Sequence, residues 1–108
     1  MRKTDDTVAS RSGGFSLAPV HPGNTLAAEL AARDLTAHAL AMKLRVPANR
    51  ISEIISGKRG ISAETALRLG RYFGTGGAFW ANLQSNYDLS SAEKQLGDRI
   101  VTEVEEAA

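Results

Sequence analysis

The segment from Pro47 to Ile55 carries polar side chains whose hydrogen-bonding groups complement the edges of DNA bases. Four residues that are expected to face outward make up this group: Ala48, Asn49, Arg50 and Glu53. Arginine pairs with guanine, asparagine pairs with adenine, a carboxylate accepts from the cytosine amino group, and alanine contacts the thymine methyl group. Each good contact contributes about 1–3 kcal/mol of discrimination between bases. We therefore predict that these four side chains contact base pairs.

A second group of residues, within this segment and on both sides of it, suits the phosphate backbone of DNA. It combines cationic side chains, hydroxyl groups and the start of a predicted helix: Thr36, Lys43, Arg45, Ser52, Lys58 and Arg59. Lysine and arginine neutralise phosphates, and free backbone N–H groups at a helix N-terminus bind anions. Contacts of this kind set the register and strength of binding but carry no sequence information.

The distribution of charge along the chain also indicates a polyanion-binding surface. Residues 36–74 contain seven basic and two acidic residues, a net charge of +5. Residues 88–108 contain two basic and six acidic residues, a net charge of −4, and the whole chain carries only +1. Solvated helix faces also vary in charge by chance, so charge alone leaves both interpretations open.

Helical spacing predicts how the polar segment is held in place. Thr36 is expected to cap one helix, Pro47 to begin the next, and Gly57 to end it. The buried faces of these two helices are expected to carry Leu40, Leu44, Ile51, Ile54 and Ile55. Because their spacing is three or four residues, these side chains anchor the polar segment from behind.

The rest of the chain predicts further short helices and no sheet, because no stretch alternates apolar and polar residues. Asn24 is expected to cap a first helix and Ser62 a fourth. A fifth helix follows the glycines at 76 and 77, and a last amphipathic segment starts at Ser90 or Ser91. The predicted fold is an all-α bundle of five or six helices. Its expected parts are a flexible, disordered arm (1–20), a DNA-binding domain (21–90) and an acidic helix or tail (91–108).

Composition argues against several other classes of protein. The chain has 108 residues and no cysteine, and no apolar run approaches the roughly 18 residues that span a membrane. We therefore expect one compact cytoplasmic domain without disulfides. His21 and His38 have no cysteine or carboxylate at a metal-ligand spacing, so we expect no metal and no other cofactor. No catalytic triad or carboxylate pair indicates an enzyme.

Several motifs within residues 21–90 have the order and spacing of a known family. They are His21-Pro22-Gly23, Arg50–Ser62, Glu64–Leu69, Tyr72-Phe73-Gly74, Phe79-Trp80, Asn82-Leu83-Gln84 and Tyr87-Asp88-Leu89. Together they resemble the HigA-type antitoxins of HigBA toxin–antitoxin modules, which are lambda-repressor-like (Xre) helix-turn-helix proteins. The resemblance implies a homodimer that binds a palindromic operator in double-stranded DNA and represses its own operon. It also implies a protein partner, a RelE-like or HigB-like toxin that cleaves mRNA and that this chain would neutralise.

Three positions depart from the pattern of that family. Arg45 occupies a turn that usually holds glycine, so we expect strained backbone angles there. Ala37 begins the second helix where a polar residue is common, which removes a side-chain contact to DNA. The pair Gly76-Gly77 replaces a stiffer stretch, which would loosen the entry to the fifth helix.

A homodimer needs a self-complementary contact, for which residues 76–90 are the candidate region. The candidate residues are Phe79, Trp80, Leu83 and Tyr87. Aromatic anchors are enriched in interfaces, but Phe79 and Trp80 more often belong to a core. A toxin would contact the N-terminal arm or the acidic C-terminal segment, and we slightly favour the arm.

Two other functions fit the same residues. A stand-alone Xre-family transcriptional regulator has the same fold and no toxin partner. A helical bundle that has lost DNA binding would serve protein interaction instead. Operator binding and purification with a neighbouring gene product separate these hypotheses.

Overall fold

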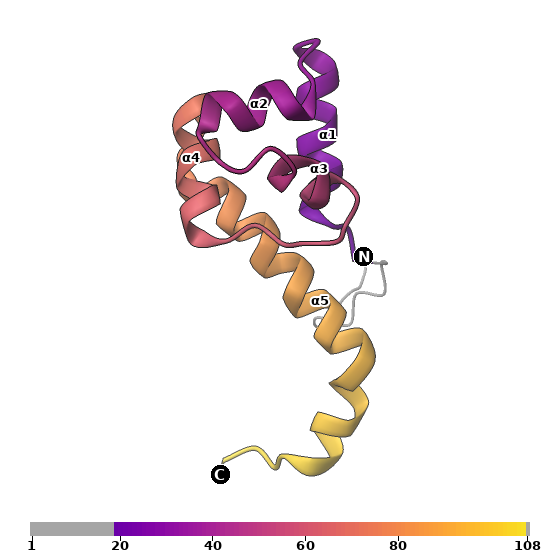
Figure 1. Ribbon diagram of the computed structural model, residues 1–108. Coiled ribbons are helices and arrows are strands. Elements are labelled where there is room, and N and C mark those ends of the chain that lie inside the picture. The colour runs from indigo at the N-terminus through magenta and orange to yellow at the C-terminus, as the bar shows by residue number, and fades with distance from the viewer. Residues whose placement is uncertain (1–18, 108) are drawn as a thin grey trace, which may run out of the picture.

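The computed structural model describes residues 19–107, and these residues form five helices and no strand. The helices are α1 (Pro22–Ala32), α2 (Ala37–Leu44), α3 (Arg50–Ile55), α4 (Ala63–Phe73) and α5 (Gly77–Glu103), as Figure 1 shows. The all-α prediction is confirmed. The first 18 residues of the predicted arm lie outside the described residues.

One apolar core joins the first four helices to the first turns of α5. Its buried members are Leu26, Leu30, Leu40, Ala41, Leu44, Val46, Ile51, Ile54, Ile61, Ala66, Leu69 and Trp80. Leu35, Ile55, Phe73 and Leu83 pack against its edge. The leucine and isoleucine faces predicted from helical spacing therefore form the interior and its margin.

Two of the predicted helix caps are confirmed. Thr36 Oγ1 accepts a hydrogen bond from the Ala39 N–H at 3.0 Å, at the start of α2. Ser62 Oγ accepts from the Thr65 N–H at 3.2 Å, at the start of α4. Each cap satisfies one of the backbone donors that a helix N-terminus leaves unpaired.

The predicted cap of α1 is wrong, because the helix begins before Asn24. His21 caps it instead, with Nδ1 accepting from the Gly23 N–H at 2.9 Å. Pro22 then takes the first helical position, where its missing N–H loses no hydrogen bond. The His21 ring also meets the edge of Tyr87 on α5, at 4.8 Å between ring centroids. The cap thereby ties the start of α1 to α5.

Arg45 ends α2 in the left-handed conformation, with φ 61° and ψ 45°. The N–H of Arg45 donates to the Met42 carbonyl at 3.2 Å, and the N–H of Val46 donates to the Ala41 carbonyl at 3.1 Å. This is the Schellman arrangement that usually places glycine at the left-handed residue. A residue with a Cβ costs about 1–2 kcal/mol there, so the strain predicted at this turn is confirmed.

Two glycines allow helices to approach closely. A Cβ at Gly23 would overlap the carbonyl of Ile54, where α1 crosses α3. A Cβ at Gly70 would overlap the backbone of Gly76 and Gly77, where the chain turns from α4 into α5. The first contact fixes α3 against the core, and the second fixes the start of α5.

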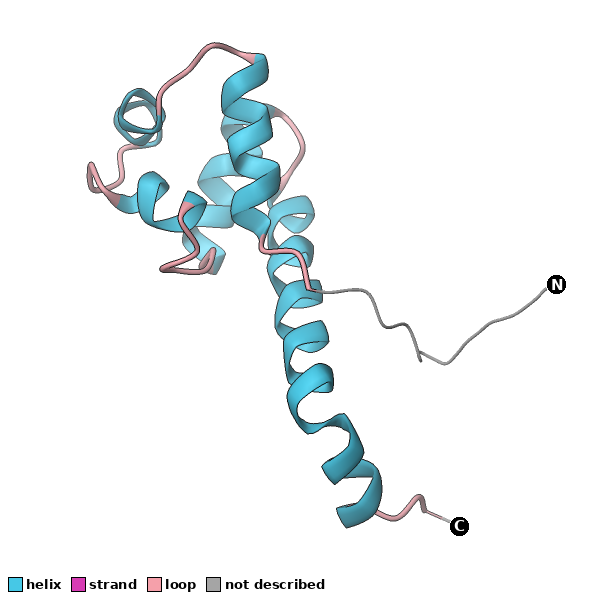
Figure 2. Ribbon diagram, turned by 90° about the vertical axis from the view of Figure 1, so that its right-hand side faces the viewer, coloured by secondary structure: helices cyan, strands magenta, loops and turns pink. Residues whose placement is uncertain are grey.

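The last helix is continuous, so the prediction of a separate segment starting at Ser90 or Ser91 is wrong. No proline occurs in its 27 residues, and no glycine interrupts it between Ala78 and Leu96. Its first half packs beside α4, and its second half projects away from the other helices (Figures 1 and 2). Among the described residues, no helix is both long and apolar enough to cross a membrane.

Candidate nucleic-acid interface

The α2–turn–α3 unit presents the predicted base-contacting residues on its outer side. Ile51 and Ile54 are completely buried, whereas Ala48 and Asn49 are exposed. α3 begins at Arg50 and not at Pro47, because the preceding residues form a turn in which the Arg50 N–H donates to the Pro47 carbonyl at 2.9 Å. Two of the four candidates therefore lie in the turn that leads into α3.

The carboxylate of Glu53 joins two other candidates. Asn49 Nδ2 donates to Glu53 Oε2 at 3.0 Å, one turn earlier in the chain. Arg59 Nε donates to Glu53 Oε1 at 3.0 Å from the loop that follows α3. Glu53 thus holds both Asn49, a predicted base contact, and Arg59, a predicted phosphate contact.

Arg50 is half-buried and reaches toward α4. Its Nη1 donates to Thr65 Oγ1 at 3.3 Å, and Ser62 Oγ lies 3.1 Å from the same oxygen. This bond engages one guanidinium nitrogen, and the arginine fork has further donors for a base. The sequence did not predict that Thr65 and Ser62 would position Arg50.

Two hydroxyl groups are candidates for phosphate binding, and they differ in whether their own proton is free to donate. Thr36 Oγ1 accepts its capping hydrogen bond, so its own proton is available to a phosphate oxygen. Ser52 Oγ donates to the Asn49 carbonyl at 3.0 Å, so its proton is already engaged within the helix. Both residues are exposed.

The loop from Gly57 to Ile61 presents Lys58 and Arg59 to solvent. Gly57 has a φ of 81°, and the Lys58 N–H donates to the Glu53 carbonyl at 2.9 Å, which closes α3. The far end of the loop is held by α5, because Gln84 Oε1 accepts from the Ile61 N–H at 2.7 Å.

Gln84 is a supporting residue that sequence reasoning missed. Its Nε2 donates to Asp88 Oδ1 at 2.9 Å, one turn further along α5. This bond orients the amide so that its oxygen faces the loop. Gln84 and Asp88 belong to two of the motifs of the family resemblance and are four residues apart, but neither signal indicates which loop they hold.

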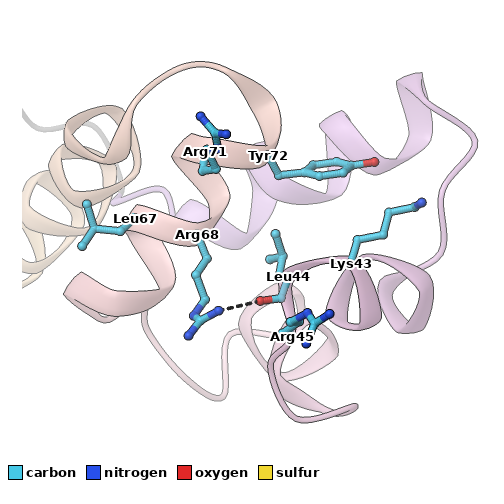
Figure 3. A pocket seen from close by; sticks show the side chains of 7 residues that line it. All are labelled: Lys43, Leu44, Arg45, Leu67, Arg68, Arg71 and Tyr72. Atoms are coloured by element: carbon cyan, nitrogen blue, oxygen red, sulfur yellow. Dashed lines mark hydrogen bonds between the residues drawn. The ribbon is translucent and has the colours of Figure 1, made fainter.

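Lys43 and Arg45 lie apart from the start of α2. They line a cleft of about 330 Å³ between the C-terminal end of α2 and α4, with Leu44, Leu67, Arg68, Arg71 and Tyr72 (Figure 3). Arg68 Nη1 donates to the Leu44 carbonyl at 3.0 Å and so satisfies an acceptor at the end of α2. An eight-residue helix is about 12 Å long, so this cleft and Thr36 are separate parts of the surface.

The four predicted dimer contacts on α5 have different environments. Trp80 is completely buried within this chain and packs between Phe73 and Phe79, so it belongs to the core and cannot contact a second copy. Leu83 and Tyr87 are half-buried, and Phe79 is 43% exposed. The most exposed apolar residues of the C-terminal region follow later in the chain: Leu89, Ile100, Val101 and Val104.

Comparison with known proteins places this fold in a family. The helix-turn-helix family model matches residues 26–80. The virulence-associated protein I of Dichelobacter nodosus is 48% identical over 84 residues, which cover 77% of this chain and 78% of that protein.

Two solved structures match with comparable identity. An addiction module antidote protein of the HigA family from Coxiella burnetii has 46% identity and a TM-score of 0.82, covering 84% of this chain and 100% of its own. The antitoxin HigA of Pseudomonas aeruginosa, solved with the higBA promoter, has 45% identity and a TM-score of 0.80, covering 83% and 99%. The chain therefore belongs to the helix-turn-helix family. Its structural neighbours are HigA-type antitoxins, which confirms the resemblance found in the motifs.

Proposed function

We propose that this chain is an antitoxin that binds the operator of its own operon and represses transcription. The observation that carries the proposal is the exposed surface formed by the turn into α3 and the following loop, where Asn49, Lys58 and Arg59 face solvent in front of a buried isoleucine face. A neighbour of 45% identity was solved with promoter DNA, which supports the proposal that this chain binds an operator.

The proposed base contacts come from Ala48 and Asn49 in the turn before α3 and from Arg50 at its first position. Their placement matches the docking mode in which the first turn of a recognition helix enters the major groove. The proposed backbone contacts come from Thr36, Lys43, Arg45, Ser52, Lys58 and Arg59. Among the cationic members, Lys58 and Arg59 stand nearest in sequence to α3, so we expect them to contribute most.

A homodimer is part of the proposal, because a palindromic operator requires two-fold symmetry in the protein. α5 is the element that we expect to supply it. Phe79 retains exposed surface near the start of this helix, and Leu89 and Ile100 are exposed along its projecting half. A second copy that pairs along α5 would cover these side chains.

The protein partner in this proposal is a RelE-like toxin that cleaves mRNA, which the chain would bind and neutralise. The alternative is a stand-alone transcriptional regulator with the same operator-binding surface.

Two experiments test the proposal in sequence. A footprint on the promoter of the chain's own operon should show two protected half-sites, and the absence of any protected segment would reject operator binding. Co-expression with the product of the adjacent small reading frame should yield a stable complex and relieve toxicity. Operator binding without complex formation would favour the stand-alone regulator.

A further inference from the structure

Glu53 lies at the centre of the proposed base-contacting surface, but its oxygens face other protein side chains. Oε2 accepts from Asn49 Nδ2 at 3.0 Å, and Oε1 accepts from Arg59 Nε at 3.0 Å. The two donors come from different elements, the turn before α3 and the loop after it. Each carboxylate oxygen is therefore engaged by a side chain of the site.

A base contact would require Glu53 to give up one of these partners. Without them, its negative charge would stand beside the phosphates, which repel it. Resting on the proposed function, we propose that Glu53 contacts no base and instead acts as a positioning residue for Asn49 and Arg59. This assignment replaces the base contact that its residue type suggested.

The bond to Glu53 determines which way the Asn49 amide faces. A carboxylate only accepts hydrogen bonds, so the NH₂ group of Asn49, and not its oxygen, must face Glu53. The amide oxygen and the second N–H of Nδ2 remain for DNA. Adenine offers the matching pair, because its N6 amino group donates and its N7 accepts. Glu53 therefore sets Asn49 to select adenine.

The bond from Arg59 to Glu53 holds the loop that follows α3 beside the base-contacting turn. The arginine side chain is 45% exposed and that of Glu53 is 30% exposed, so the pair contributes little to folding. Its effect lies in fixing a cation next to the base-contacting turn. Removing Glu53 frees both Asn49 and Arg59 and also deletes a negative charge from the DNA-facing surface.

The test measures the affinity of the full-length chain for its operator, for duplexes with single base-pair changes, and for an unrelated duplex. Glu53→Ala and Asn49→Ala should each lose discrimination at the same adenine, by on the order of tenfold. The double variant should lose no more than either single one, because both act through one contact. Glu53→Ala should also bind the unrelated duplex more tightly, because it lacks one repelling charge.

Two further variants sharpen the result. Glu53→Gln keeps an acceptor for Asn49 Nδ2 and should retain most of the adenine preference. Glu64→Ala removes the same charge from an exposed position on α4, where Glu64 pairs with Arg68, and should leave the preference at every base unchanged. Circular dichroism confirms that each variant is folded.

Three outcomes would overturn the inference. A loss of discrimination in Glu53→Ala at a base pair that Asn49→Ala leaves unaffected would mean that Glu53 contacts a base itself. Unchanged discrimination in Glu53→Ala would leave the proposed function intact and remove only the positioning role. A wild-type chain that binds operator and unrelated duplex equally would reject the proposed function and this inference together.

Discussion

The packed part of the molecule and the projecting half of α5 use the same kinds of residue in different surroundings. In the packed part, Leu26, Leu69 and Trp80 have no exposed surface. Beyond residue 88, Leu89 is 69% exposed and Val101 is 80% exposed. Both regions are helical and amphipathic in sequence. The difference shows that periodicity predicts an apolar face but not whether the same chain covers it.

The largest expected effect compares the same substitution, leucine to alanine, in the two regions. Leu69→Ala should lower the free energy of unfolding by about 2–5 kcal/mol, because it leaves a cavity in the core. Leu89→Ala should change it by less than about 0.5 kcal/mol in dilute protein, where no second copy covers the side chain. Urea unfolding followed by circular dichroism measures both. Equal losses would show that the projecting half of α5 belongs to the folded core.

A pair of glycine substitutions should change stability in opposite directions. Gly70→Ala places a Cβ on the backbone of Gly76, so we expect a loss of about 1–3 kcal/mol. Gly97→Ala meets only the Glu93 side chain at 3.4 Å, and alanine favours a helix interior, so we expect a gain of about 0.5–1 kcal/mol. The midpoints of urea unfolding measure both. A stabilised Gly70→Ala would mean that the turn from α4 into α5 is looser than its geometry implies.

Relieving the strained turn after α2 should raise the stability of the packed part. Arg45→Gly should stabilise the chain by about 0.5–1 kcal/mol, because glycine removes the clash of a Cβ in the left-handed conformation but loses more backbone entropy on folding. Arg45→Ala is the control, since it removes the same charge but keeps the strain. Thermal unfolding compares the two. If Arg45→Ala stabilised as much, the relief would come from charge and not from the backbone.

The smallest effect is expected at the end of the projecting helix. Glu103 pairs with Arg99 at 3.7 Å between Oε2 and Nε, and both side chains are mostly exposed. Glu103→Ala should therefore lower the free energy of unfolding by less than about 0.5 kcal/mol, and added salt should abolish the difference. A loss above 1 kcal/mol would indicate that this end of α5 is packed and not projecting.

Features that depend on local chemistry could be predicted from the sequence. The caps at Thr36 and Ser62 and the buried isoleucines of α3 follow from neighbouring residues alone. The strain at Arg45 was predicted from the glycine that the family usually has at that turn. The His21 cap was missed because histidine is an uncommon capping residue, although its Nδ1 accepts as an oxygen would. The break predicted near Ser90 rested on serine as a cap, but a serine also fits within a continuous helix.

Contacts between distant segments could not be predicted in the same way. The bond from Arg59 to Glu53 and the bond from Ile61 to Gln84 depend on how loops and helices meet in space. The buried position of Trp80 likewise depends on the close turn at Gly70. The candidate site was therefore found by residue type, while the roles of its members required the fold.

The most direct test of the central claim is the salt dependence of DNA binding by the wild-type chain and by Lys58→Ala. The wild type should bind its operator at least about 10³-fold more tightly than an unrelated duplex. Lys58→Ala should weaken binding to both duplexes by a similar factor and reduce the slope of log K against log[salt] by about 0.9, the value for one lost phosphate contact. Equal wild-type affinity for the two duplexes would contradict sequence-specific operator binding. A slope that Lys58→Ala leaves unchanged would contradict the assignment of this surface to DNA.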